Sequence, residues 1–210
     1  MKTRAFQRFA GLAAILAGVV GLLYSFAFVV LVVGGQAPEL GVFLSALCLM
    51  LGGLFSSAAL VAVFDRVREA NPALALWGAL LSLTGALGSV IHAGYDLANA
   101  VNPPPSSVPG LADLPSQIDP RGLLTFGIAG LGLFVLASLM ARSGSFPRPL
   151  GLLGSVLAVL LVVIYLGRLI ILSPTNPLVA GLIVVTGFIV NPAWYIWLGV
   201  TLMRTSAGSD

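Results

Sequence analysis

Residues 9–33 read FAGLAAILAGVVGLLYSFAFVVLVV, an apolar stretch without a charged side chain. An α-helix rises about 1.5 Å per residue, so about 20 such residues cross the hydrocarbon core of a bilayer. Lys2, Arg4 and Arg8 precede the stretch, as in a secretory signal, but the apolar region of a signal spans only about 7–15 residues. We therefore interpret 9–33 as an uncleaved first transmembrane helix.

The same pattern recurs along the whole chain. Of the 210 residues, 59% are hydrophobic and 8% are charged, whereas an ordinary soluble domain has about 25% charged residues. A soluble protein would expose this apolar surface to water, which excludes a cytosolic enzyme, a nucleic-acid-binding protein and a disordered chain. The sequence predicts an all-α, polytopic membrane protein, a six-transmembrane-helix bundle that forms a single domain. The predicted helices cover residues 9–33, 40–64, 73–100, 122–141, 150–172 and 178–203.

Prolines mark several of the predicted boundaries. Pro72 fits the first turn of the third helix, where its missing N–H would have no helical partner. Residues 102–121 contain six prolines and too few apolar residues for a core, so we expect an outer loop there. This loop is either an inert connection or a lid over the bundle. The sequence SPTNP at 173–177 divides the last apolar run into the fifth and sixth helices.

Basic residues determine the predicted orientation. With the N-terminus inside, eight of the ten Lys and Arg residues lie on the cytoplasmic side, and only Arg121 and Arg168 lie outside. By the positive-inside rule, this asymmetry predicts that both termini are cytoplasmic. The net charge of +3 then reflects membrane orientation, and we expect no nucleic-acid partner. The eight inner residues are Lys2, Arg4, Arg8, Arg66, Arg68, Arg142, Arg148 and Arg204.

Small residues indicate how the third helix packs. Two stripes at four-residue spacing follow it: Gly78, Ser82, Ala86 and Gly85, Ser89, Ala93. Small side chains let membrane helices approach closely, so we expect this helix to pack centrally. The second stripe leads to His92 and Asp96, which lie one turn apart. The single histidine and a carboxylate are therefore expected on the packed face.

A polar cluster is predicted near the outer interface. Counting about 1.5 Å per residue from the inner helix ends brings Tyr165 and Arg168 to the depth of His92 and Asp96. Tyr95 joins them, and ionisable residues at membrane depth are candidates for a ligand or proton site. Two other interpretations stay open. Arg168 can extend to the head groups while His92 and Asp96 solvate a helix end, or Asp96 and Arg168 can form a structural ion pair.

Asn191 and Pro192 interrupt the sixth predicted helix. Proline removes a backbone hydrogen bond and kinks the helix, and the Asn191 side chain can bind the freed carbonyl or a neighbouring helix. Because broken membrane helices can line substrate cavities, Asn191 joins the candidate ligand-binding residues, with a plain kink as the alternative.

Several membrane chemistries lack the residues that they need. Lys2 is the only lysine and lies outside the bilayer, so no retinal Schiff base can form. A single histidine cannot supply two axial haem ligands, and HAGYD at 92–96 is not the zinc-protease pattern. Cys48 is the only cysteine, which excludes an intramolecular disulfide and a cysteine metal cluster. We expect neither a cofactor nor a metal site.

The junction before the fifth helix reads ARSGSFPRPLG at residues 141–151. It resembles the junction of a family of bacterial six-helix integral membrane proteins known only as a domain of unknown function. That junction also has arginine, serine and glycine followed by proline, arginine, leucine and glycine. Residues 8–12 and 197–200 extend the likeness over nearly the whole chain. The resemblance implies six helices in a bacterial cytoplasmic membrane and adds no activity.

Two hypotheses of function follow from the sequence. The first is a protein that binds or transports a small or lipid-like ligand in a bundle cavity open to the outer side of the bilayer. The second is a structural or regulatory subunit that acts through helix contacts with a partner membrane protein or a second copy. A membrane enzyme comes third, because it needs a nucleophile or a carboxylate pair that the sequence does not single out.

Overall fold

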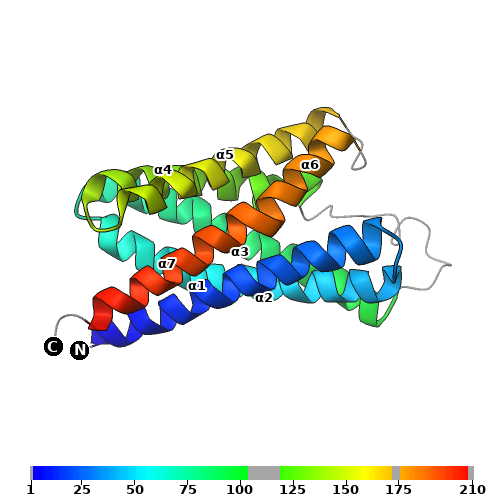
Figure 1. Ribbon diagram of the computed structural model, residues 1–210, viewed down its shortest axis with the longest axis horizontal. Coiled ribbons are helices and arrows are strands. Elements are labelled where there is room, and N and C mark those ends of the chain that lie inside the picture. The colour runs from blue at the N-terminus through cyan, green and yellow to red at the C-terminus, as the bar shows by residue number, and fades with distance from the viewer. Residues whose placement is uncertain (1, 104–118, 172–175, 208–210) are drawn as a thin grey trace.

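The protein is a bundle of long helices. The computed structural model describes residues 2–103, 119–171 and 176–207, and within these ranges it contains helices, turns and short connections but no strand. Six helices are long and apolar enough to cross a membrane, which confirms the predicted all-helical, six-helix fold. The chain therefore has the architecture of a multi-pass membrane protein. Figure 1 shows both termini at one end of the bundle, here called the terminal end; the opposite end is the distal end.

Several spans consist of more than one helical element. Three segments, η1, η3 and η4, are π-helical, and η2 is a single 3₁₀ turn. In chain order the elements are α1 (Lys2–Phe26), η1 (Ala27–Val33), α2 (Pro38–Val67), α3 (Pro72–Val101), η2 (Pro120–Gly122), η3 (Leu123–Ile128), α4 (Ala129–Ser143), α5 (Arg148–Ile170), α6 (Pro177–Val185), η4 (Thr186–Val190) and α7 (Asn191–Ala207).

The helices differ at their ends from the predicted ranges. The first begins at Lys2 instead of residue 9, and the second continues through Asp65 to Val67. Long charged side chains can reach the head groups while their backbone stays helical, so the first charge marks the edge of the membrane and not the end of the helix. The fifth ends at Ile170, before the predicted residue 172. The other spans differ by a few residues.

Two predicted connections lie largely outside the described residues. These are 104–118 of the expected outer loop and 172–175 of the SPTNP break.

The helices that follow polar caps begin as their sequences predict. The Asn71 side chain accepts a hydrogen bond from the backbone N–H of Leu74 at 3.0 Å, and Pro72 opens α3. Asn176 likewise accepts from Leu178 N–H, also at 3.0 Å. Side-chain caps of this kind satisfy backbone donors that have no helical partner.

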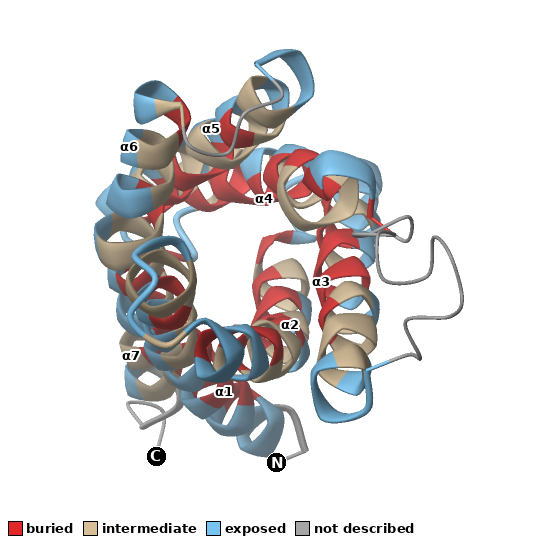
Figure 2. Cartoon of the chain, turned by 90° about the vertical axis from the view of Figure 1, so that its right-hand side faces the viewer, coloured by how far each residue is buried: buried red, intermediate tan, exposed pale blue. Residues whose placement is uncertain are grey.

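The six spans form a ring. Figure 2, seen from the distal end, shows the helices arranged in a ring. Each of α1 to α4 packs on the next helix in the chain, and α7 closes the ring by packing along α1. The sixth span changes neighbours along its length, because α7 lies on α1 whereas α6 leans on α5 (Figure 1). In the described part of the chain, α6 makes no substantial contact with α1 or η1.

The terminal half of the ring is filled by a dense apolar core. Trp194 of α7 is fully buried, and its indole N–H donates to the carbonyl of Leu150 on α5 at 3.2 Å. A buried indole needs such a partner, and here the bond ties the sixth span to the fifth. The fully buried large side chains of this core are Val63, Val67, Leu136, Met140, Leu150, Leu157, Trp194, Leu198 and Leu202.

A group of polar contacts around Arg66 ties the helices together at the terminal end, and we call these contacts of Arg66 with Gln7, Ser145 and Leu202 the clasp. Arg66 Nε donates to the Gln7 side-chain oxygen at 3.0 Å, and one of its terminal nitrogens donates to the Leu202 carbonyl at 3.3 Å. Ser145 Oγ donates to the Arg66 carbonyl at 3.1 Å, and the Arg66 guanidinium lies 5.3 Å from the centre of the buried Phe146 ring. The junction at 141–151 thus holds α2 against α4 and α5, which is a structural role.

Candidate functional site

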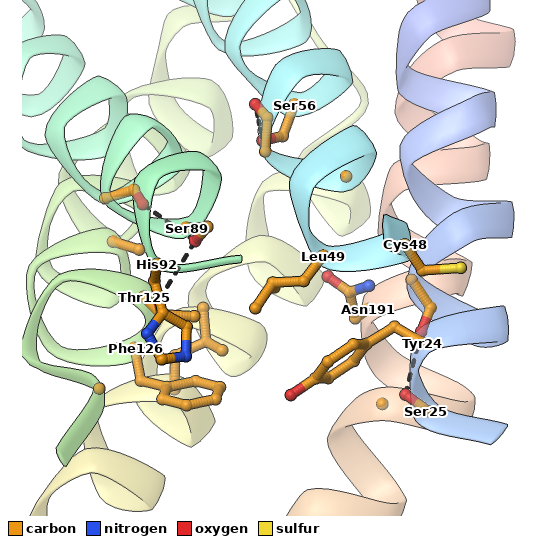
Figure 3. A pocket seen from close by; sticks show the side chains of 18 of the residues that line it. Tyr24, Ser25, Cys48, Leu49, Ser56, Ser89, His92, Thr125, Phe126 and Asn191 are labelled. Atoms are coloured by element: carbon orange, nitrogen blue, oxygen red, sulfur yellow. Dashed lines mark hydrogen bonds between the residues drawn. The ribbon is translucent and has the colours of Figure 1, made fainter. Parts of the chain in front are cut away.

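A cavity of about 380 Å³ lies inside the ring, mostly in its distal half. This volume lies within the range of about 300–1,000 Å³ that is typical of small-molecule sites. All six spans contribute to its wall. Figure 3 shows Tyr24 and Leu49 pointing into the cavity from one side, with His92 and Phe126 on the other. The dense core of the terminal half lies beneath it.

His92 and Asp96 form a pair on the cavity wall. His92 Nε2 lies 3.4 Å from an Asp96 carboxylate oxygen, one helical turn away on α3. The second ring nitrogen, Nδ1, is buried and has no hydrogen-bond partner among the described residues. When Nε2–H donates to the carboxylate, Nδ1 of the neutral ring is an acceptor, so the wall offers a buried polar group to whatever fills the cavity.

Arg168 of α5 lies on an aromatic ring of the fourth span. Its guanidinium carbon is 5.4 Å from the centre of the Phe126 ring, and the side chain lines the cavity. A Cβ at Gly122 would lie 3.0 Å from one terminal nitrogen of Arg168, and the positive φ of Gly122, 80°, also favours glycine there. The turn into the fourth span therefore leaves room for the guanidinium.

Asp119 holds the start of the fourth span. It is 1% exposed and accepts from the backbone N–H groups of Leu124 at 2.6 Å and Thr125 at 3.1 Å. The Thr125 hydroxyl also donates to it at 2.6 Å, and Ser89 Oγ of α3 lies 3.4 Å from that hydroxyl. A carboxylate that accepts several N–H groups stabilises a helix start. The network fixes η3 against α3 beside His92.

Two buried hydroxyls face the cavity without a partner among the described residues. They are Ser82 Oγ on α3 and Thr186 Oγ1 in η4, on side chains that are 2% and 4% exposed. Leaving a buried donor unsatisfied costs about 1–3 kcal/mol, and a water or a ligand group removes this cost. The cavity wall thus carries unused hydrogen-bonding capacity at two further points.

The sixth span is π-helical immediately before Asn191 and Pro192. Pro192 has no N–H for the carbonyl of Phe188, four residues earlier, so the regular ladder cannot continue through this turn. Asn191 lines the cavity, and its amide nitrogen lies 2.6 Å from the position that a Cβ at Gly21 would take. Asn191 therefore fills the space beside α1 where Gly21 has no side chain.

The structure brings four of the predicted site residues to one cavity and leaves two outside it. His92, Asp96, Arg168 and Asn191 all line the cavity. Tyr165 packs on Gly127 of η3, where an added Cβ would lie 3.0 Å from its ring, and neither Tyr165 nor Tyr95 is among the lining residues. No Asp96–Arg168 ion pair within 4.0 Å forms between these described side chains.

Several lining residues were missed by the sequence reasoning. Tyr24 lies within electrostatic range of both Arg168 and Asp96, but in the sequence it is one aromatic residue in a long apolar run. Asp119 was assigned to the outer loop. Its position directly before Pro120 is a helix-start signal that could have placed it at the fourth span.

Within the described ranges, no group of three or more His, Cys, Asp or Glu residues is placed to hold a metal ion. Comparison with known proteins adds no assignment: no family model matches the sequence, and neither a curated protein nor a solved structure matches it. The resemblance based on residues 141–151 therefore stays a prediction.

Proposed function

We propose that the protein binds a small or lipid-like ligand in the distal cavity and either carries it or senses it. The observation that supports this most is the contrast between the two halves of the bundle. The terminal half is filled by large apolar side chains, whereas the distal half encloses about 380 Å³ beside buried polar atoms that lack partners. Interiors are normally close-packed, so a hollow that coincides with unsatisfied polar groups favours an occupant.

The proposed orientation places the terminal end in the cytoplasm. It rests on the eight basic residues at the inner helix ends and in the inner loops against two at the other side. The cavity then faces the outer half of the membrane. The cytoplasmic membrane of a bacterium is the proposed location, on the strength of the sequence resemblance.

A cavity-filling variant with a matched control tests the proposal. Leu49 points into the cavity from α2, whereas Leu54 on the same helix is 46% exposed on the outer surface of the bundle. Leu49→Trp and Leu54→Trp make the same chemical change, but only Leu49→Trp fills the cavity. Each protein is purified in lipid nanodiscs, and bound molecules are identified by native mass spectrometry.

We expect a molecule that is retained by the wild type and by Leu54→Trp and is lost from Leu49→Trp. Equal retention by all three proteins would place the bound molecule outside the cavity and contradict the proposal. Absence of any bound molecule, together with stable copurification of another membrane protein, would favour the alternative of a subunit that acts through helix contacts.

A further inference from the structure

The helices at the distal end leave a lateral gap between η1 and α6. Near the middle of the bundle the first and sixth spans touch, where a Cβ at Gly187 would lie 3.1 Å from Ser25 Cβ. Further along, α6 leans on α5 and leaves the first span, and a Cβ at Gly181 would meet no atom of the described residues within 4 Å. Figure 1 shows the orange α6 and the blue first span diverging toward the distal end.

Apolar side chains connect this gap to the cavity. Phe28 and Val32 of η1 and Ile183 of α6 line the cavity next to the gap. Directly beside them, Val33 and Val184 are 57% and 39% exposed on the outer surface. Both elements belong to spans that cross the membrane, so the outer surface here borders lipid chains. An acyl chain could therefore pass from the bilayer into the cavity along a continuous apolar path.

Arg168 is the cavity group that favours an acidic head group. Both cavity carboxylates have partners, because Asp96 pairs with His92 and Asp119 accepts from Leu124 and Thr125. Among the described residues, Arg168 has no carboxylate within 4.0 Å and contacts the Phe126 ring instead. A cation at membrane depth is costly without a counter-charge, and guanidinium binds carboxylate and phosphate groups well.

We propose that the ligand is an acidic amphiphile from the distal leaflet, whose apolar chain enters between η1 and α6 and whose anionic head binds Arg168. This inference rests on the proposed function and names its ligand class and route of entry. Tyr24 also points into the cavity, and its hydroxyl can donate a hydrogen bond to the head (Figure 3). The chain occupies the apolar part of the cavity around Leu49 and Ile164.

The head-group assignment is tested with two probes that differ only in charge. The wild type in lipid nanodiscs is titrated with 11-(dansylamino)undecanoic acid and with its uncharged methyl ester. Arg168→Gln should weaken binding of the acid at least tenfold and leave binding of the ester unchanged. Arg142→Gln, an exposed arginine at the terminal end, is the control and should bind both probes as the wild type does. Unchanged ester binding also shows that Arg168→Gln is folded.

The route of entry is tested with two adjacent residues. Ile183→Trp narrows the gap from the cavity side, whereas Val184→Trp places the same side chain on the outer surface. Acid probe carried in vesicles is mixed with each protein in stopped flow. Ile183→Trp should slow association several-fold, and Val184→Trp should leave it unchanged.

The outcomes distinguish a failure of this inference alone from a failure of the proposed function. Equal binding of acid and ester by the wild type and by Arg168→Gln would overturn the acidic head group and leave the cavity site standing. An association rate unaffected by Ile183→Trp that rises with the aqueous probe concentration would overturn lateral entry. No binding of either probe by the wild type would contradict the proposed function and this inference together.

Discussion

Gly85 of α3 lies so close to the fourth span that no larger residue should fit at this position. A Cβ at this position would lie 2.5 Å from Ala129 Cβ, 2.6 Å from its Cα and 2.8 Å from its backbone nitrogen. Carbon atoms normally approach to about 3.5–4.0 Å, so Gly85→Ala forces α3 and α4 apart by about 1 Å. Because two of the three contacts are backbone atoms, no rotamer change can relieve the clash.

The size of the effect follows from two opposing terms. Overpacking a well-packed site costs about 1–3 kcal/mol, and replacing glycine by alanine inside a helix gains about 1 kcal/mol. Gly94→Ala in the same helix is the matched control, since an added Cβ there meets none of the described atoms within 4 Å. We expect Gly94→Ala to stabilise the protein by about 0.5–1 kcal/mol. The two variants should then differ by about 1–3 kcal/mol, because the propensity gain is common to both.

The assay is reversible unfolding of the purified protein in mixed micelles with increasing SDS, followed by circular dichroism. Gly85 and Ser82 also lie on the cavity wall, so Gly85→Ala should weaken binding of the acid probe as the spans separate. If Gly85→Ala were as stable as Gly94→Ala, the close approach of α3 and α4 at this residue would be refuted.

Two further predictions concern the terminal half, and each has a control a few residues away in the sequence. Trp194→Phe removes the hydrogen bond to the Leu150 carbonyl and should lower the free energy of unfolding by about 1–3 kcal/mol in the same assay. Trp197→Phe, at a residue 39% exposed, should change it by less than about 0.5 kcal/mol. Equal effects of the two substitutions would mean that the indole hydrogen bond contributes nothing to stability. Arg66→Gln loses charged hydrogen bonds to Gln7 and Leu202 and should lower the free energy of unfolding by about 1.5–3 kcal/mol. Arg68→Gln loses only an exposed ion pair to Asp65 at 3.4 Å, which contributes about 0–1 kcal/mol. A loss of stability in Arg68→Gln as large as that in Arg66→Gln would contradict the clasp.

The number of spans was predictable because charge-free runs of bilayer length are a property of the sequence alone. The packed face of α3 was predictable too, since Gly78, Ser82, Gly85 and Ser89 are buried as their four-residue spacing predicts. Small residues in a membrane helix have few other uses than close approach. Hydropathy did not predict where each span bends, because the π-helical turns depend on backbone bonding that an apolar run does not reveal.

The depth of the candidate site residues in the membrane was predictable, but the direction in which each side chain points was not. Counting residues brought Tyr165 close to Arg168, yet Tyr165 faces η3 while Arg168 lines the cavity. When nearly every face of a helix is apolar, its rotation about its own axis leaves no trace in hydropathy. Asp119 shows a different limit, since it reaches the cavity only because the chain turns at Arg121 and Gly122, both with positive φ.

The division of the bundle into a packed half and a hollow half follows from the medium around it. In water, the hydrophobic effect would drive α6 onto the first span and close the gap, because both surfaces are apolar. In a bilayer, lipid chains contact those surfaces as well as protein does, so closing the gap gains little. The clasp of Arg66 and the Trp194 bond hold the helices together at the terminal end instead. Stability from one half therefore lets the other half keep the gap between η1 and α6, as the proposed entry of a ligand from the bilayer requires.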